Sequence, residues 1–146
     1  VGEDDRATRP LFGDAGTATL IEADPAASPW TFQLGTDGTG QEHLIVRRGL
    51  FRDSPLDGRP IECAESRLAM NGAEIFAFTL REVPPLVESS LQAAGWSWDD
   101  VHSVVMHQAN EFMLKHLGKR LKLPAAKQPL SLNTYGNTSS ASIPLT

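Results

Sequence analysis

The amino-acid sequence predicts an α/β layered fold, in which strands and helices alternate along the chain. Apolar residues in segment 70–83 recur at the three- and four-residue spacing of an amphipathic helix. The apolar run 101–106 is typical of a buried strand, and segment 111–123 again has a helical pattern. A strand followed by a helix, repeated along a chain, indicates layers of helices packed on a sheet.

The N-terminal part of the chain predicts strands separated by irregular segments. Segment 17–22 is rich in β-branched and apolar residues, and segment 30–34 alternates large apolar with polar residues, so both favour strands. Segment 35–67 holds many glycines and prolines and predicts only a short strand at 44–47. Such a long irregular stretch is typical of a functional or partner-contacting excursion.

Prolines and a glycine predict how the first helix continues and where it ends. Pro84 and Pro85 are expected to interrupt it, because proline inside a helix removes backbone hydrogen bonds. Proline is tolerated in a first turn, so a second helix is expected over 86–94. Gly95 is expected to end that helix, since glycine readily adopts the left-handed conformation.

The C-terminal part predicts one capped helix followed by a strand and a further helix. Asn110 is the expected N-cap of helix 111–123, which Pro124 ends. The apolar face of this helix is expected to hold Phe112, Leu117 and Leu121. Segment 130–132 is a strand candidate, and the small residues that follow it are expected to open a final helix.

Composition excludes several classes of protein. The chain has 146 residues, 40% hydrophobic and 21% charged, which suits one domain with a real core. Its formal net charge of −5 argues against a generic basic nucleic-acid binder. No apolar run approaches the ~18 residues of a membrane span, and the acidic start, residues 3–5, does not suit a signal peptide. The chain begins without methionine and stops within apolar sequence, so we expect it to be incomplete at both ends.

Two polar side chains at the expected ends of strands are the main candidates for chemistry. His107 follows the strand candidate 101–106, where a neutral imidazole can donate a hydrogen bond or move a proton near neutral pH. Asn137 lies about thirty residues later, and its amide can donate to a developing oxyanion. Ligands in α/β proteins gather at the carboxyl ends of strands, so both side chains can converge on one carbonyl oxygen. Taken alone, His107 is also compatible with a partly buried structural histidine, and Asn137, which follows a glycine, with a turn.

Other candidate groups carry weaker signals. Cys63, the single cysteine, cannot form an internal disulfide and fits a reducing compartment. Its neighbours Glu62 and Glu65 disfavour the thiolate, so we interpret it as structural or incidental. A serine from the run 139–142 and His107 could resemble the nucleophile and base of a serine hydrolase. The Gly-x-Ser-x-Gly motif of such enzymes is absent from the sequence, however. The remaining histidines lack the spacing of metal ligands, so no metal site is expected.

Four ordered motifs lie along the chain: residues 11–18, the helix opening 70–76, the sequence His-Gln-Ala-Asn at 107–110, and the run 135–144. Together they resemble one enzyme family, the β-ketoacyl-acyl carrier protein synthase III family of condensing enzymes. The resemblance spans nearly the whole chain. It implies a thiolase-like fold with layers α-β-α-β-α built from two similar halves, of which residues 1–146 would be most of the second, C-terminal half.

The resemblance implies a reaction and a set of site residues. Members join an acyl group held on a cysteine to a malonyl thioester, with loss of carbon dioxide. By motif position, His107 and Asn137 match the histidine and asparagine of a Cys-His-Asn triad, and both would donate to the malonyl thioester carbonyl. Four positions match residues that line the substrate tunnel: Gly72, Phe76, Thr79 and Asn110.

The departures from the family pattern leave an alternative open. The nucleophilic cysteine lies in the absent first half, and Cys63 does not occupy its place, so this chain alone is expected to be inactive. Where many members carry a basic residue for the carrier protein, this sequence has Phe112. Basic residues on the same helix are expected to compensate: Lys115, Lys119, Arg120 and Lys122. The alternative function is a non-catalytic partner subunit or binding module that keeps the fold without the cysteine. Retention of both His107 and Asn137 favours the enzyme.

The resemblance also implies partners and a setting. The substrates would arrive as coenzyme A or acyl carrier protein thioesters, no separate cofactor is expected, and fatty acid or related acyl-chain biosynthesis is the implied process. Family members are usually cytoplasmic homodimers. Neither nucleic acid nor a membrane is an expected partner.

Overall fold

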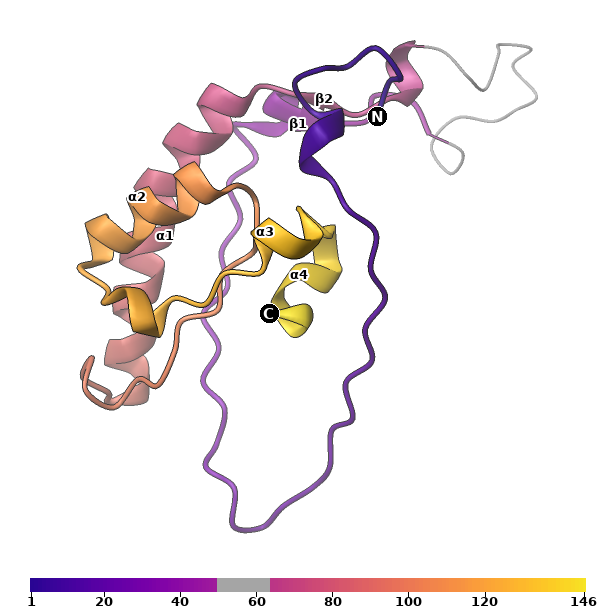
Figure 1. Ribbon diagram of the computed structural model, residues 1–146. Helices are drawn as coiled ribbons and strands as arrows, with labels where there is room; N and C mark the ends of the chain where they lie inside the picture. The colour runs from indigo at the N-terminus through magenta and orange to yellow at the C-terminus, as the bar shows by residue number, and fades with distance from the viewer. Residues whose placement is uncertain (50–63) are drawn as a thin grey trace. The chain divides into compact units, whose positions relative to one another are not determined.

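The computed structural model describes residues 1–49 and 64–146, so Cys63 and much of the irregular segment 35–67 lie outside the described residues. The chain divides into two compact units, which are considered one at a time. The first contains residues 1–10 and 36–78, and the second contains residues 11–35 and 79–146. Figure 1 traces their elements along the chain.

The first unit contains a short antiparallel pair of strands. Strand β1 (Leu44–Ile45) pairs with strand β2 (Ala69–Met70), with Leu44 opposite Met70. The strand predicted at 44–47 is therefore confirmed over its first two residues. The backbone N–H of Asn71 donates to the carbonyl of His43 at 2.8 Å and extends the pairing to the start of the following helix.

Helix α1 (Gly72–Ala94) is a single helix of 23 residues, so the predicted interruption at Pro84 and Pro85 is wrong. Asn71 caps its first turn by accepting a hydrogen bond from the backbone N–H of Glu74. The fixed φ of proline is itself helical, and Pro84 is the buried residue of this helix, so its packing offsets the lost hydrogen bonds. Gly95 ends the helix with φ +69°, as predicted.

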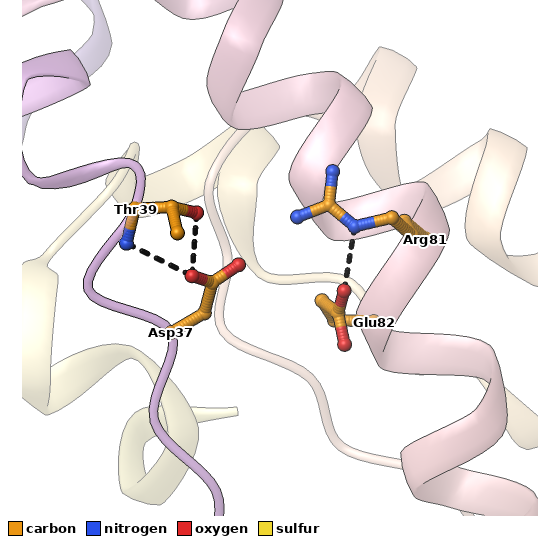
Figure 2. Close-up of polar contacts among 4 residues, drawn as sticks. All are labelled: Asp37, Thr39, Arg81 and Glu82. Carbon is orange, nitrogen blue, oxygen red and sulfur yellow. Dashed lines mark hydrogen bonds and ion pairs between the residues drawn. The ribbon is translucent and has the colours of Figure 1, made fainter.

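Two local polar contacts lie on exposed parts of the chain, one in a turn and one on a helix (Figure 2). The Asp37 carboxylate accepts hydrogen bonds from the backbone N–H of Thr39 at 2.9 Å and from its hydroxyl at 2.6 Å, which closes a tight turn. On helix α1, Arg81 Nε donates to the carboxylate of Glu82 at 2.6 Å. Both members of this ion pair are exposed, so it contributes roughly 0–1 kcal/mol to stability.

Helix α2 (Glu111–Leu121) contributes buried apolar side chains to the core of the second unit. Asn110 is its N-cap, as predicted, and accepts a hydrogen bond from the backbone N–H of Met113 at 2.8 Å. Lys122 closes the other end in the left-handed conformation, with φ 56°. The predicted apolar face is correct for Leu117 and Leu121, but Phe112 is 63% exposed. The buried face contains Met113, Leu114, Leu117, Gly118 and Leu121.

The C-terminal segment forms short turns rather than a strand and a long helix. Segment 130–132 is not a strand, because helix α3 (Leu132–Tyr135) begins within it. The predicted final helix is present as a 3₁₀ turn (Ser139–Ala141) followed by helix α4 (Ser142–Leu145). Within the described ranges, no helix is both long and apolar enough to cross a membrane.

Three predicted strands lack regular structure in the second unit: segments 17–22, 30–34 and 101–106. A strand is stable only when neighbouring strands satisfy its backbone groups. Within the described ranges, the run 101–106 makes one backbone hydrogen bond to a distant segment, from the Val104 N–H to the Lys127 carbonyl at 2.7 Å, and Lys127 is not in a strand. In the first two segments, large apolar side chains remain exposed, including Leu20 at 83% and Leu34 at 93%. Their sequence pattern fits a sheet whose other strands are not among the described residues.

The exposed apolar residues predict how the isolated chain behaves. Segments 17–22 and 30–34 place several large apolar side chains in water, which is typical of a surface meant to be covered. We expect the isolated 146-residue chain to bind an apolar fluorescent dye and to self-associate, as measured by dye fluorescence and light scattering. Monomeric behaviour with no dye binding would contradict this expectation.

Candidate functional site

A polar site is built in the second unit from two segments, the turn before helix α2 and the small-residue run after helix α3. Gln108 anchors the first segment and is completely buried. Its side-chain amide donates to the Met106 carbonyl at 2.9 Å, and its side-chain oxygen accepts from the Ser131 N–H at 3.0 Å. Both polar ends of this glutamine are therefore satisfied inside the protein, which fixes the backbone beside His107.

A chain of hydroxyl groups connects this anchor to the second segment. Thr146 Oγ1 donates to the Ser142 carbonyl at 2.6 Å, which uses its single hydrogen. The Ser131 hydroxyl, 2.7 Å from Thr146 Oγ1, must then donate to it. These contacts hold the first turn of helix α4 against the segment that carries His107.

His107 is held by a direct side-chain hydrogen bond. Its Nδ1 lies 2.7 Å from Oγ of Ser142, a residue that is only 1% exposed. Packing around the imidazole lowers the pKa of His107 below its ordinary value of 6.5, and a backbone hydrogen bond with Ser139 opposes this with a smaller effect. The residue still keeps part of its surface exposed. His107 is therefore a neutral imidazole near pH 7 that remains accessible to a ligand.

Asn137 is held through both its backbone and its side chain. Its N–H donates to the Leu11 carbonyl at 2.8 Å, and its own carbonyl accepts from the Gly13 N–H at 3.0 Å, so residue 137 pairs in parallel with Phe12. The side-chain oxygen accepts from the Ser139 N–H at 2.9 Å. This contact orients the amide and leaves its NH₂ group without a hydrogen-bond partner among the described residues.

Ser139 connects the two candidate residues. Its N–H donates to the side-chain oxygen of Asn137. A hydrogen bond with its backbone also raises the pKa of His107. Ser139 has φ 55°, a conformation that is uncommon for a residue other than glycine and that often occurs at functional sites. The structure thus brings the two predicted residues to the same short segment, although thirty residues separate them in sequence.

The backbone of residues 11–13 lies close against that of residues 135–137, which holds Asn137 in place. Gly136 has φ +67°, and a Cβ on it would lie 3.1 Å from the Leu11 carbonyl oxygen. A Cβ on Gly13 would collide with the Tyr135 carbonyl oxygen. Only glycine at both positions allows the two segments to come this close.

Gly13→Ala is expected to destabilise this part of the protein. The added methyl group forces the backbone of residues 135–137 to move, and such overpacking costs about 1–3 kcal/mol. Chemical denaturation measures this loss. Gly16→Ala is the matched control, because a Cβ there meets nothing within 4 Å. Equal stability of the two variants would contradict the close approach.

One buried hydroxyl next to Asn137 is unsatisfied. Thr138 is 5% exposed, and its Oγ1 has no hydrogen-bond partner among the described residues. Its methyl group faces the position of Gly13, at 3.7 Å from where a Cβ would be. A buried hydroxyl without a partner is costly, so it marks a place where a further group is expected.

The other predicted site residues lie in both units. Asn110 and Thr79 belong to the second unit, and Gly72 and Phe76 to the first. The side-chain oxygen of Asn110 is used in capping helix α2. Phe76 and Thr79 are half-buried on helix α1, and Gly72 is exposed at its first position. Their assignment to a substrate tunnel stays a prediction.

The structure adds residues that sequence reasoning did not assign. Gln108 and Ser142 hold His107 in place, yet the sequence marks them only as part of a motif and of a small-residue run. The contact of Ser142 with His107 also bears on the hydrolase alternative. At 1% exposure, the Ser142 hydroxyl cannot reach a substrate carbonyl, which disfavours it as a nucleophile. Among the described residues, no three potential metal ligands lie together, and the expectation of no metal site stays a prediction because Cys63 is not among them.

Comparisons with known proteins agree on one family. Residues 91–146 match the model of the C-terminal domain of 3-oxoacyl-[acyl-carrier-protein] synthase III. The chain is 38% identical to chloroplastic β-ketoacyl-[acyl-carrier-protein] synthase III B of Cuphea wrightii, covering 97% of this chain and 38% of that protein. It is 40% identical to the β-ketoacyl-[acyl-carrier-protein] synthase III of Roseiflexus castenholzii, covering 97% and 43%. The chain thus spans about two fifths of the curated relatives it matches.

The structure is also similar to a solved enzyme. The crystal structure of β-ketoacyl-[acyl-carrier-protein] synthase III from Thermus thermophilus superimposes with a TM-score of 0.76 and 35% identity, over 97% of this chain and 43% of that one. The fold is therefore that of part of a thiolase-like α/β protein. Within this class, the chain belongs to the 3-oxoacyl-[acyl-carrier-protein] synthase III family, of which it represents the C-terminal region.

Proposed function

We propose that this chain supplies the decarboxylating half of the active site of a 3-oxoacyl-[acyl-carrier-protein] synthase III-like acyltransferase. The observation that carries the proposal is that one short run, residues 137–142, holds both side chains: Ser142 Oγ lies 2.7 Å from His107 Nδ1, and the Ser139 N–H donates to the side chain of Asn137. The full-length enzyme would condense an acyl thioester with a malonyl thioester in fatty acid or related acyl-chain biosynthesis. Its cysteine nucleophile would come from an N-terminal half that this chain does not contain.

The proposed chemistry separates into a leaving step and a bond-forming step. The malonyl carboxylate leaves as carbon dioxide, and its bonding electrons move onto the thioester group as an enolate. The enolate carbon then attacks the acyl group on the cysteine, so that a carbon–carbon bond forms and the cysteine thiolate departs. The first step is slow without help, because negative charge gathers on the thioester oxygen.

His107 and Asn137 are suited to stabilise that charge. The amide of Asn137 is oriented by the Ser139 N–H, so its NH₂ group can donate to an oxygen. Burial keeps the pKa of His107 low, so its ring is neutral near pH 7 and donates without protonating the enolate. Donors fixed before the reaction need no rearrangement when the charge develops, and such donors typically contribute several kcal/mol.

The surrounding residues are proposed to guide the substrate. Gly72, Phe76, Thr79 and Asn110 would line the tunnel for the pantetheine arm and the acyl chain. Helix α2 would meet the carrier through its exposed basic residues, although Lys115 forms an ion pair with Glu111 at 2.7 Å. The exposed ring of Phe112, which lies 4.1 Å from the ring of His116, adds an apolar element to that surface. Either coenzyme A or acyl carrier protein can deliver the thioesters in this proposal.

The proposal includes the assembly and setting of the full-length enzyme. We propose that it functions as a cytoplasmic homodimer, needs no cofactor beyond its thioester substrates, and that residues 1–146 are inactive by themselves. The alternative of a non-catalytic partner subunit receives no support from the relatives, which are named as synthases.

Condensation by the full-length protein tests the proposed function. Purified enzyme is given an acyl-coenzyme A and malonyl-acyl carrier protein, and the 3-oxoacyl product is identified by mass spectrometry. We expect product with the full-length enzyme and none with residues 1–146 alone. Absence of product with every acyl-coenzyme A length tested, from a folded full-length protein, would contradict the proposal.

A further inference from the structure

In the hydrogen bond between Ser142 and His107, the other partners of the Ser142 hydroxyl indicate which group donates and which accepts. Ser142 Oγ has two partners among the described residues, His107 Nδ1 at 2.7 Å and the backbone N–H of Gln108 at 3.4 Å. The Gln108 N–H can only donate, so it occupies a lone pair of the hydroxyl oxygen. The hydroxyl hydrogen then has one acceptor within reach in the described part of the chain, Nδ1 of His107.

Burial makes this direction energetically important. Ser142 is 1% exposed, so water does not provide another acceptor for its hydrogen. If His107 carried its hydrogen on Nδ1, two hydrogens would compete for the short contact and the serine hydrogen would lose its partner. An unsatisfied buried hydroxyl typically costs about 1–3 kcal/mol. The opposite arrangement satisfies both groups.

We propose that Ser142 is a positioning residue whose buried hydroxyl donates to Nδ1 of His107 and thereby places the hydrogen of the neutral imidazole on Nε2. This inference rests on the proposed function, because the tautomer matters for a ring that donates to a thioester oxygen. No side chain among the described residues is hydrogen-bonded to Nε2, and the ring donates in its hydrogen bond with the Ser139 backbone, because that bond raises its pKa. With Nδ1 accepting from Ser142, the donating N–H is the one on Nε2, and in the proposed mechanism a substrate oxygen competes with this backbone for it. The other tautomer would present a lone pair to an oxygen that is gaining negative charge, which is repulsive.

Ser142 itself is placed by contacts that a substrate does not need to supply. Its carbonyl accepts a hydrogen bond from Thr146 Oγ1. Thr146 is in turn hydrogen-bonded to the Ser131 hydroxyl, and the Ser131 N–H donates to the side chain of the buried Gln108. The hydroxyl is therefore fixed in the free protein. Ser142 acts only through His107 and does not touch the reacting atoms.

The tautomer of His107 is measured directly by nitrogen NMR of the full-length enzyme labelled with ¹⁵N-histidine, at a pH where the ring is neutral. The signals of His107 are assigned by their loss in His107→Ala. We expect the wild-type ring to be protonated on Nε2. In Ser142→Ala, we expect a population protonated on Nδ1 to appear and malonyl decarboxylation to fall about tenfold, the scale of one hydrogen bond.

Two further readouts make the test specific. Transfer of the acyl group to the cysteine is expected to remain unchanged in Ser142→Ala, because that step does not use His107 in the proposed mechanism. Ser140→Ala, a change at an exposed serine of the same run, is the matched control and should change neither tautomer nor rate.

Each outcome decides the inference. A wild-type ring protonated on Nδ1 overturns it, and this result needs no variant, so it stands even if Ser142→Ala does not fold. A folded Ser142→Ala protein with unchanged tautomer and rate also overturns it. These failures leave the proposed function intact as long as His107→Ala is inactive. Full decarboxylation by His107→Ala would instead refute the proposed function, whatever the tautomer.

Discussion

Replacing His107 by alanine in the full-length enzyme is expected to slow malonyl decarboxylation about 10²–10³-fold, the usual effect of losing one oxyanion donor. The variant keeps the backbone anchored by the buried Gln108, so the loss should come from the missing ring rather than from unfolding. Release of labelled carbon dioxide from a malonyl thioester measures the step. Thermal unfolding should show a loss of about 1–3 kcal/mol and no unfolding at the assay temperature, because the buried Ser142 hydroxyl loses its acceptor.

His102→Ala is the matched control for this prediction. His102 lies on the same segment, is exposed, and forms no side-chain hydrogen bond with the run 137–142 in the described part of the chain. Its replacement should leave decarboxylation unchanged. A His107→Ala enzyme that decarboxylates at nearly the wild-type rate would contradict the role assigned to the ring.

Replacing Asn137 by aspartate is expected to lower malonyl decarboxylation at least as strongly as a loss of one donor, about 10²–10³-fold. The carboxylate has nearly the same shape and can still accept from the Ser139 N–H, so the local fold should persist. It has no NH₂ group, however, and it places a negative charge beside the developing enolate. The same carbon dioxide assay measures the loss, and circular dichroism verifies the fold.

Asn133→Asp serves as the control for the charge change. Asn133 is exposed on helix α3, so its replacement adds the same charge without touching the site. It should retain activity. If Asn137→Asp retained activity as well, the amide would not be donating to the thioester, and the assignment of Asn137 would be wrong.

Local chemistry explains which features of the fold the sequence predicts correctly. Asn110 caps helix α2 and Gly95 ends helix α1, because each depends on one residue and its immediate neighbours. Predictions that depend on distant partners are less successful. Segments 17–22 and 101–106 have the composition of strands, yet a strand also needs neighbouring strands, and the described residues do not provide them. Phe112 fits a helical face by spacing alone, but the packing leaves it exposed.

The site shows the same division between local and distant information. His107 and Asn137 are identifiable from their positions and from the family motifs. The residues that hold them are not, because Ser142 contacts His107 across 35 positions and Asn137 pairs with residues 11–13 near the other end of the chain. A Gly-Asn pair by itself indicates a turn. Only the close approach that Gly13 allows reveals why the backbone of Asn137 is fixed.

The most direct test of the proposed site is decarboxylation by the full-length double variant His107→Ala/Asn137→Ala compared with each single variant. If both side chains bind one thioester oxygen, they act as a unit, and removing the second should cost much less than removing the first. We therefore expect the double variant to be only slightly slower than the single variants. Multiplication of the two single losses would show that the residues act independently, and it would contradict a shared oxyanion site.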